Sequence, residues 1–151
     1  MNTSVHTATT AEAGVVAQLL YDFNVEFDTP TPPVPALTRR LAELIESGET
    51  VVLLGGAGPH GLAVLRFRPS MWSEGLECYL AELYVVPDRR GNGLGRALMT
   101  AALETARARG ADSMDIGVDE PDLPARRLYE SLGFANRNEH GDVMYVYERE
   151  L

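Results

Sequence analysis

The chain has 151 residues, of which 45% are hydrophobic and 23% are charged, so it can bury one core and is too short for two ordinary domains. Its formal net charge of −9 at pH 7 argues against nucleic acid and anionic membranes as partners and favours cationic substrates. Because the sequence has no membrane-length apolar run, no signal-peptide pattern and only one cysteine, we expect a cytoplasmic protein.

The first half of the sequence predicts strands and helices on either side of a proline-rich loop. Apolar residues recur at helical spacing after Thr9 and Thr10, and either threonine can cap the helix. Four prolines between residues 28 and 35 exclude a helix or a central strand there. The expected elements are a strand at 5–8, a helix at about 11–23, an extended loop at 28–35, a helix at about 36–47, and strands at 50–54 and 62–68 around a turn at 55–60.

The second half predicts a long strand that leads into a glycine-rich loop and then a helix. Arg107, Arg109 and Gly110 stand where that helix should end, and basic residues followed by glycine are typical of a helix C-terminus. The expected elements are a strand at 76–86, a helix from 93 to about 110, a buried strand at 114–118, a helix at 123–132, and a final alternating strand at 143–148.

Glycines alternate at positions 91, 93 and 95, directly after the long strand and at the start of a helix. Without a Cβ, a residue lets a phosphate approach the backbone, and positive φ values can turn successive N–H groups toward it. The helix adds its N-terminal amides, and Arg89, Arg90 and Arg96 add positive charge. The pattern indicates a pyrophosphate-binding loop, and the alternative is a turn that only joins strand to helix.

Two better-known glycine loops do not fit this spacing. A Walker A loop needs a lysine, but all 13 basic residues are arginine, which also suggests a GC-rich bacterial source. A dinucleotide fingerprint needs G-x-G-x-x-G, whereas this loop reads G-x-G-x-G. The spacing Arg90-x-x-Gly93-x-Gly95 instead resembles the coenzyme A signature, R/Q-x-x-G-x-G/A, of the GNAT superfamily of N-acetyltransferases.

A second segment carries the same resemblance. Residues 125–134 match the family pattern A-x-x-L-Y-x-x-x-G-F at every fixed position. The resemblance implies that Tyr129 protonates the departing thiolate, whereas the simpler alternative is an aromatic ring that packs the helix on the sheet. Relatives often have asparagine where this chain has Asp122, and Asp122 can instead cap the helix.

The order of the expected elements resembles the acetyltransferase fold over the whole chain. The resemblance implies an α/β protein with a mixed, mostly antiparallel central sheet of about six to seven strands and helices on both faces. Because no linker interrupts the sequence, we expect a single N-acetyltransferase domain over residues 1–151.

The resemblance also implies acetyl-CoA as the cofactor, without a metal or a covalent intermediate. In the family, a backbone N–H of the strand before the loop binds the tetrahedral oxyanion, and this position falls near Leu83. Val85 and Val86 should pair with the pantetheine amides, because that strand parts from its neighbour. The residues expected to bind the coenzyme are Leu83, Tyr84, Val85, Val86, Arg90, Gly91, Asn92, Gly93, Leu94, Gly95, Arg96, Asp122, Arg126 and Tyr129.

Acidic residues point to the acceptor side of the reaction. The amine arrives protonated, and Glu82 is our candidate base because it should share a strand face with Tyr84. Glu82 could equally be an exposed strand carboxylate, or a group that holds a cationic acceptor without moving a proton. Phe23, Glu26 and Asp28 are expected to bind the substrate, although loop carboxylates are usually only solvated.

These features predict an acetyl-CoA-dependent N-acetyltransferase that modifies a primary amine of a small, cationic molecule by direct attack in a ternary complex. The alternatives are a protein or peptide amine acetyltransferase and a non-catalytic acyl-CoA-binding module. Tyr129 and Glu82 argue against the non-catalytic alternative, since such a module needs neither. No side chains have metal-ligand spacing, so we expect no metal site, and an exposed final strand could support a homodimer.

Overall fold

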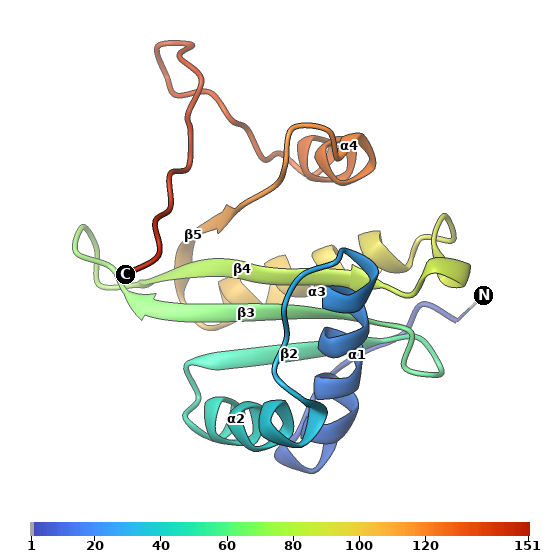
Figure 1. The fold of residues 1–151 in the computed structure, drawn as a ribbon. Helices are drawn as coiled ribbons and strands as arrows, with labels where there is room; N and C mark the ends of the chain where they lie inside the picture. Colours follow the sequence, from blue (N-terminus) through green and yellow to red (C-terminus); the bar gives the residue numbers. More distant parts are fainter. Residues whose placement is uncertain (1) are drawn as a thin grey trace. The chain divides into compact units, whose positions relative to one another are not determined.

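The computed structural model describes residues 2–151, which form two compact units. The larger unit runs to Ile116 and the smaller one from Gly117 to Leu151 (Figure 1). No helix of the described residues combines the length and the apolar character that crossing a membrane requires. That residues 1–151 act as a single domain stays a prediction.

The larger unit contains a five-stranded sheet in the order β1-β2-β3-β4-β5. The first four strands are antiparallel to their neighbours, whereas β5 is parallel to β4. A mixed, mostly antiparallel sheet is therefore confirmed, with five strands instead of six to seven. The strands are β1 Val5–Thr7, β2 Thr50–Gly55, β3 Gly61–Pro69, β4 Leu76–Val85 and β5 Ala111–Ile116.

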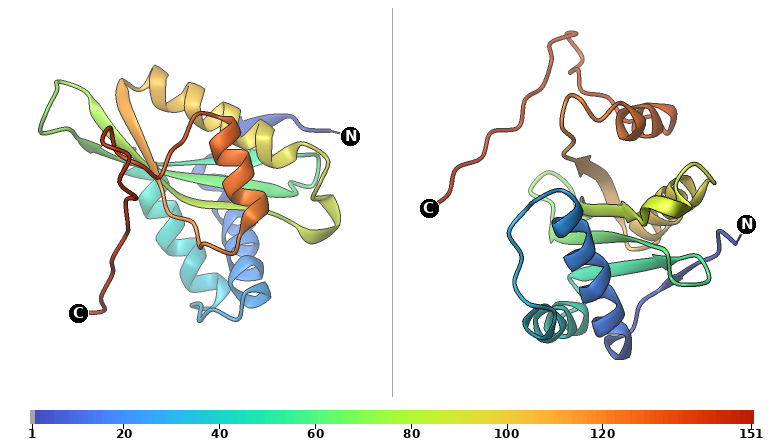
Figure 2. Two further views of the ribbon diagram at one scale, coloured as in Figure 1. Left: turned by 90° about the horizontal axis from the view of Figure 1, so that it is seen from above. Right: turned by 45° about the vertical axis from the view of Figure 1, so that its right-hand side comes forward.

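Helices cover both faces of this sheet, as predicted. Helices α1 (Ala13–Glu26) and α2 (Val34–Glu46) lie on one face, and α3 (Leu94–Ala108) lies on the other (Figure 2, left). Val52 and Leu62 belong to the core under α1 and α2. All six residues of β2 are buried, as expected for a strand between two covered faces.

The close approach of α3 to the sheet depends on a glycine in β2. A Cβ on Gly55 would lie 2.9 Å from Cδ1 of Leu94 and 3.1 Å from Cδ2 of Leu98. Both leucines are buried, so neither side chain can move aside without loss of packing. Gly55 therefore fixes the first turn of α3, directly after the glycine-rich loop, against the sheet.

Local signals set the starts of the two helices on the other face. The Thr9 N–H donates to Oε1 of Glu12 at 3.1 Å, within the capping box of a short 3₁₀ turn (Thr10–Glu12) that leads into α1. Thr9 therefore caps this turn, whereas α1 itself begins at Ala13, two residues later than predicted, and its own N-cap, Glu12, makes no side-chain cap bond. Helix α2 begins at Val34, two residues earlier than predicted, because Pro35 lies in the first turn, where no N–H is needed.

Strand β4 changes its pairing half-way along. The β3–β4 register pairs Leu65 with Leu80 but Val64 with Glu82, so Ala81 is an extra residue in β4. Beyond this bulge, the even-numbered residues of β4 change faces: Leu80 lies opposite Leu65, whereas Tyr84 joins the core under α1 and α2. Strand β5 pairs with β4 only from Leu76 to Leu80, so the predicted parting of the two strands is confirmed.

The smaller unit contains helix α4 (Leu123–Ser131) and little other regular structure. The Oδ1 atom of Asp122 accepts the N–H of Ala125 at 3.2 Å, which confirms that Asp122 caps this helix. Beyond α4, the described residues contain one isolated bridge, between Arg137 and Val143.

Two strand predictions near the C-terminal end were wrong. The final strand at 143–148 is not formed, because apart from the bridge at Val143 the segment has no ladder of paired backbone groups. Tyr147, for example, is 90% exposed. The strand at 114–118 instead spans Ala111–Ile116, and none of its residues is buried, because it is the edge strand of the sheet and carries polar Asp112 and Asp115.

Candidate active site

The open edge of β4 presents backbone groups that no strand uses. The Val86 N–H donates to the His60 carbonyl oxygen at 2.9 Å, so Val86 points toward the β3 side. Because both polar groups of a residue in an antiparallel pair point the same way, and successive residues alternate, Leu83 and Val85 point away from β3. Their N–H and C=O groups therefore face the side that β5 leaves open.

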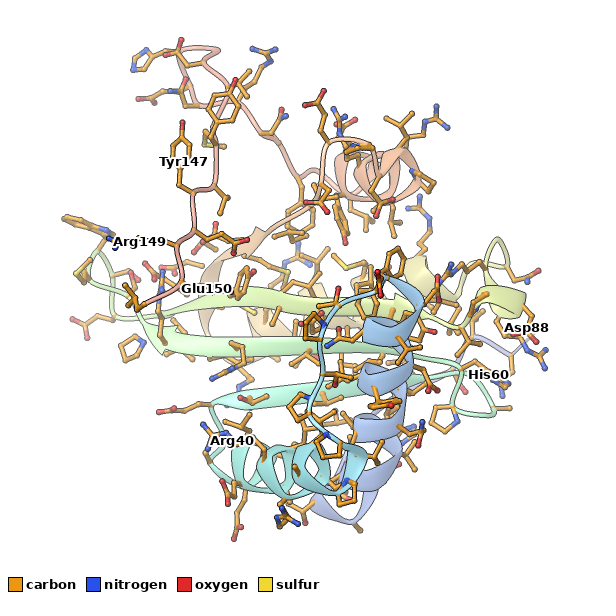
Figure 3. All side chains as sticks on the ribbon, viewed as in Figure 1. Arg40, His60, Asp88, Tyr147, Arg149 and Glu150 are labelled. Atoms are coloured by element: carbon orange, nitrogen blue, oxygen red, sulfur yellow. The ribbon has the colours of Figure 1, made fainter. Side chains whose placement is uncertain are left out.

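Val86 itself has both backbone groups engaged. Its N–H is bound to His60, and its carbonyl oxygen accepts the Arg89 N–H at 3.0 Å. Figure 3 shows His60 in the turn between β2 and β3, and Asp88 just beyond β4 at the same end of the sheet. Pairing of an extended ligand with this strand therefore rests on Leu83 and Val85.

The glycine-rich loop follows β4 through a short 3₁₀ turn (Pro87–Arg89) and has the conformation that the sequence predicts. Gly91 has φ of +76° and Gly93 has φ of +86°, values that L side chains rarely adopt. A Cβ on either glycine would meet nothing within 4 Å, so the loop surface is open. Backbone conformation, and not crowding within the chain, therefore requires glycine at both positions.

The loop ends at the N-terminus of α3. Gly93 is the N-cap, in the left-handed conformation, and no side chain caps the helix. The first intrahelical hydrogen bond is donated by the Ala97 N–H to the Gly93 carbonyl oxygen at 3.0 Å. The N–H groups of Leu94 and Gly95 therefore have no acceptor within the helix. The amide of Asn92 donates to the Arg90 carbonyl oxygen at 3.2 Å and steadies the loop. A glycine N-cap thus leaves the positive end of the helix dipole available for an anion.

Arg90, expected to bind the coenzyme, contacts protein groups instead of lying over the loop. Its Nε donates to the Val85 carbonyl oxygen at 2.8 Å. Its Nη2 lies 2.9 Å from Oε1 of Glu26, and its Nη1 lies 2.8 Å from Oε2. Sequence reasoning missed this pair, because 64 residues separate the partners and no local pattern links them.

Glu26 belongs to an aromatic cluster at the end of α1. The Tyr84 hydroxyl donates to Oε1 of Glu26 at 3.2 Å, and the Tyr84 ring stacks on Phe23 with 4.8 Å between centroids. The bond to Arg90, followed by the Tyr84 hydroxyl, holds the pKa of Glu26 below its ordinary value, although burial opposes the shift. Phe23 and Glu26 are thus brought together, whereas Asp28 lies in the next loop with φ of +52°.

Glu82 has a different environment from Glu26. It lies opposite Val64, on the same face of β4 as Tyr84, as predicted. No hydrogen bond or ion pair among the described residues occupies its carboxylate. Its side chain reaches solvent, yet desolvation by the surrounding protein raises its pKa. A carboxylate with a raised pKa and no partner is a better proton acceptor than an ordinary glutamate.

Tyr129 is the buried residue of α4. Its ring meets Phe134 edge to face, with 6.1 Å between centroids. Burial, helped by the negative charge of Asp122, raises the pKa of Tyr129 to about 12, so its hydroxyl is protonated at neutral pH. In the same unit, Nη1 of Arg126 donates to the Glu120 carbonyl oxygen at 2.8 Å.

Other candidate nucleophiles and ligands carry no comparable signal. Cys78 is buried, and burial raises the pKa of its thiol to about 11, so it is not an activated nucleophile. The described residues contain no group of three or more His, Cys, Asp or Glu side chains placed to hold a metal ion.

Comparison with known proteins identifies the family to which the chain belongs. A model of the acetyltransferase (GNAT) family matches residues 17–134, which include β4, the glycine-rich loop and α4. The chain belongs to the GNAT family. This membership agrees with the resemblance carried by the glycine spacing and by the segment around Tyr129.

Individual relatives extend the comparison. A protein of Arthrobacter sp. FB24, assigned as an acetyltransferase, is 48% identical over 98% of this chain and 96% of its own, with a TM-score of 0.92. A mycothiol acetyltransferase of Thermobispora bispora is 49% identical over 76 residues, which are 48% of this chain and only 25% of that protein. An aminoglycoside acetyltransferase from a soil metagenome, solved with sisomicin, is 17% identical over 97% of this chain and 96% of its own (TM-score 0.78), and shows the fold alone.

The loop conformation yields a prediction with a matched control. Gly93→Ala should weaken coenzyme A binding at least tenfold, because its Cβ disfavours φ of +86° and lies on the loop surface. Gly110→Ala, at the other end of α3, has φ of +84° and an equally open surround. Each substitution should cost about 1–2 kcal/mol of stability. Calorimetry with coenzyme A should separate the two variants, and equal losses of affinity would show that the loop is only a turn.

Proposed function

We propose that this chain is an acetyl-CoA-dependent N-acetyltransferase that acts on a primary amine of a small, cationic molecule, as one domain over residues 1–151. The observation that carries the proposal is the continuity of the open β4 edge with the glycine-rich loop. The edge offers Leu83 and Val85 to the amides of a pantetheine arm, and the loop and the α3 N-terminus offer amides to a pyrophosphate. Coenzyme A has the matching groups in the same sequence: a pantetheine arm with amides, followed by a pyrophosphate.

Attack of a neutral amine on the thioester carbonyl creates a tetrahedral oxyanion. The Leu83 N–H is our candidate donor, because it points to the open side and belongs to a strand fixed by its pairing with β3. A donor that is already oriented where charge develops stabilises the transition state without reorganisation, and one such group is typically worth about 10²–10³-fold in rate.

Two side chains would move the protons. Glu82 would take the proton of the incoming ammonium, directly or through water, since its carboxylate has no partner and its pKa is raised. Tyr129 would protonate the departing thiolate, because burial raises its pKa to about 12 and keeps its hydroxyl protonated at neutral pH. A base with a raised pKa and an acid that stays protonated are the two groups that this reaction needs at neutral pH.

Charge supports a cationic acceptor. The net charge of −9 attracts cations, and Glu82 presents an uncompensated carboxylate on the same face of β4 as Tyr84, whose ring stacks on Phe23. Two of the relatives are described as acetyltransferases of mycothiol and of aminoglycosides, which are small molecules. The identity of the acceptor is not carried over from them, because the match to the first covers a quarter of its length. A homodimer and a cytoplasmic location remain part of the proposal.

A panel of amines tests the proposed reaction. Release of free thiol from acetyl-CoA should be faster with small amines that carry a second positive or polar group than with acidic amino acids. The preference should shrink as salt rises, because ions screen the attraction between exposed charges. Preference for acidic amino acids at every salt concentration would contradict the cationic acceptor, and acetylation of peptides alone would favour a protein substrate.

The role of the phenol is tested by Tyr129→Phe, which removes one oxygen and keeps the ring. Turnover should fall on the order of 10²-fold while coenzyme affinity changes little, since the proton is transferred only in the transition state. Tyr79→Phe is the control, because Tyr79 is half exposed on the outer part of β4. If turnover of the Tyr129 variant stays within twofold of the wild type, the ring serves only in packing.

The role of Glu82 is tested by Glu82→Gln and the pH profile of kcat/KM. In the wild type the rate should fall as pH drops through the raised pKa of Glu82, and the variant should lose this limb and about 10²-fold in kcat. Desolvation makes ionised Glu82 unfavourable in the folded state, so the variant should be no less stable at neutral pH. Glu77→Gln, on the same strand but paired with Arg68, is the control. A raised KM with an unchanged profile would make Glu82 a binding group.

A further inference from the structure

Arg90 contacts both the strand edge that is proposed to bind the coenzyme and the carboxylate of Glu26 on the acceptor side. The guanidinium of Arg90 has three acceptors: the Val85 carbonyl oxygen at 2.8 Å, and the two carboxylate oxygens of Glu26 at 2.9 and 2.8 Å. The bidentate contact with Glu26 is the strong form of an arginine–carboxylate pair. The guanidinium also lies over the Tyr84 ring, 5.7 Å from its centroid.

The first of these acceptors is a group that the coenzyme needs. The carbonyl of Val85 points to the open side of β4, where the proposed function places the amides of the pantetheine arm. An amide N–H of that arm and the Arg90 Nε would donate to the same oxygen from the same side. A carbonyl oxygen can accept two hydrogen bonds, but the Arg90 guanidinium lies against the same open edge as the arm would, so pairing with Val85 favours withdrawal of the Arg90 side chain.

The other acceptor is a group that a cationic amine needs. Glu26 lies at the end of α1 beside Phe23 and Tyr84, but both of its oxygens are bound to Arg90, and Oε1 also accepts the Tyr84 hydroxyl. In this arrangement Arg90 neutralises the carboxylate, so Glu26 has little attraction for a second cation.

The planarity of the guanidinium couples these two contacts. Nε and both Nη atoms lie in one rigid plane, so a movement that carries Nε away from Val85 also turns the two Nη atoms relative to Glu26. A place to which it can move is close by, because Arg90 immediately precedes Gly91 of the glycine-rich loop. A pyrophosphate in that loop would attract the displaced cation.

We propose that Arg90 is a movable cap that couples coenzyme binding to acceptor binding. The coenzyme displaces its guanidinium from Val85 and Glu26, and Glu26 then becomes the uncompensated carboxylate that holds the positive charge of the acceptor. This inference rests on the proposed function, and it adds Glu26 as a residue that determines specificity only after the coenzyme has bound. Because such coupling is reciprocal, coenzyme and acceptor should each bind more tightly in the presence of the other.

The test is Glu26→Gln, which leaves the size of the side chain unchanged and removes the ion pair. Calorimetry with coenzyme A should show tighter binding, on the order of 3- to 10-fold, because the variant no longer holds Arg90 away from the loop. With the best amine of the panel, the same variant should raise KM several-fold and leave kcat nearly unchanged, because Glu26 binds charge and moves no proton. The two substrates should thus respond with opposite signs.

Asp88→Asn controls for the loss of one negative charge near the phosphates. Asp88 lies in the turn that leads to the loop and has no ion pair among the described residues, so its removal changes the local charge and leaves Arg90 in place. In about 0.5 M salt, where the Debye length is about 4 Å, the gain in coenzyme affinity should remain for the Glu26 variant and vanish for Asp88→Asn.

The outcomes separate this inference from the proposed function. If wild-type protein does not bind coenzyme A, the proposed function itself fails. If wild type binds it but Glu26→Gln, folded by circular dichroism, binds it no more tightly than Asp88→Asn does, Arg90 is not a displaceable cap. Weaker binding of both coenzyme and amine would show that the Glu26–Arg90 pair only stabilises the structure of the site.

Discussion

The parting of β4 from β5 after Leu80 is the constraint on which the rest of this site depends. A buried strand that loses its neighbour has backbone groups without partners, and such groups are costly unless water, a side chain or a ligand binds them. In this chain, part of the exposed edge is bound by Arg90 through the Val85 carbonyl. The glycine-rich loop continues from this edge, and Gly55 holds α3 close enough for its first turn to complete the loop.

The bulge at Ala81 decides which side chains accompany that edge. In an unbroken strand, Cys78, Leu80, Glu82 and Tyr84 would all lie on one face. The extra residue moves Glu82 and Tyr84 to the face of α1, where Phe23 and Glu26 lie, and leaves Leu80 opposite Leu65. A one-residue change in register thus combines a carboxylate, a phenol and an aromatic ring from elements that are distant in the sequence.

Sequence reasoning recovered those features whose cause is local. Glycine spacing, the cap at Thr9 and the alternation of apolar residues predicted the loop, a helix start and most strands, and the family segment around Tyr129 located α4. It failed where the cause is non-local. The Arg90–Glu26 pair needs two elements 64 residues apart to meet, and the segment 143–148 has an alternating pattern but no partner strand within the described structure. Alternation shows that a segment can pair, and only the fold shows whether it does.

The buried cysteine has a practical consequence. Cys78 is buried in β4, and its thiol, with a pKa of about 11, is almost wholly protonated at neutral pH. A folded sample should therefore give almost no background with disulfide or maleimide reagents, so that colour development in a thiol assay reports the coenzyme alone. Because a buried thiol reacts only when the packing around it opens, its labelling rate also measures how often this part of the native protein opens locally.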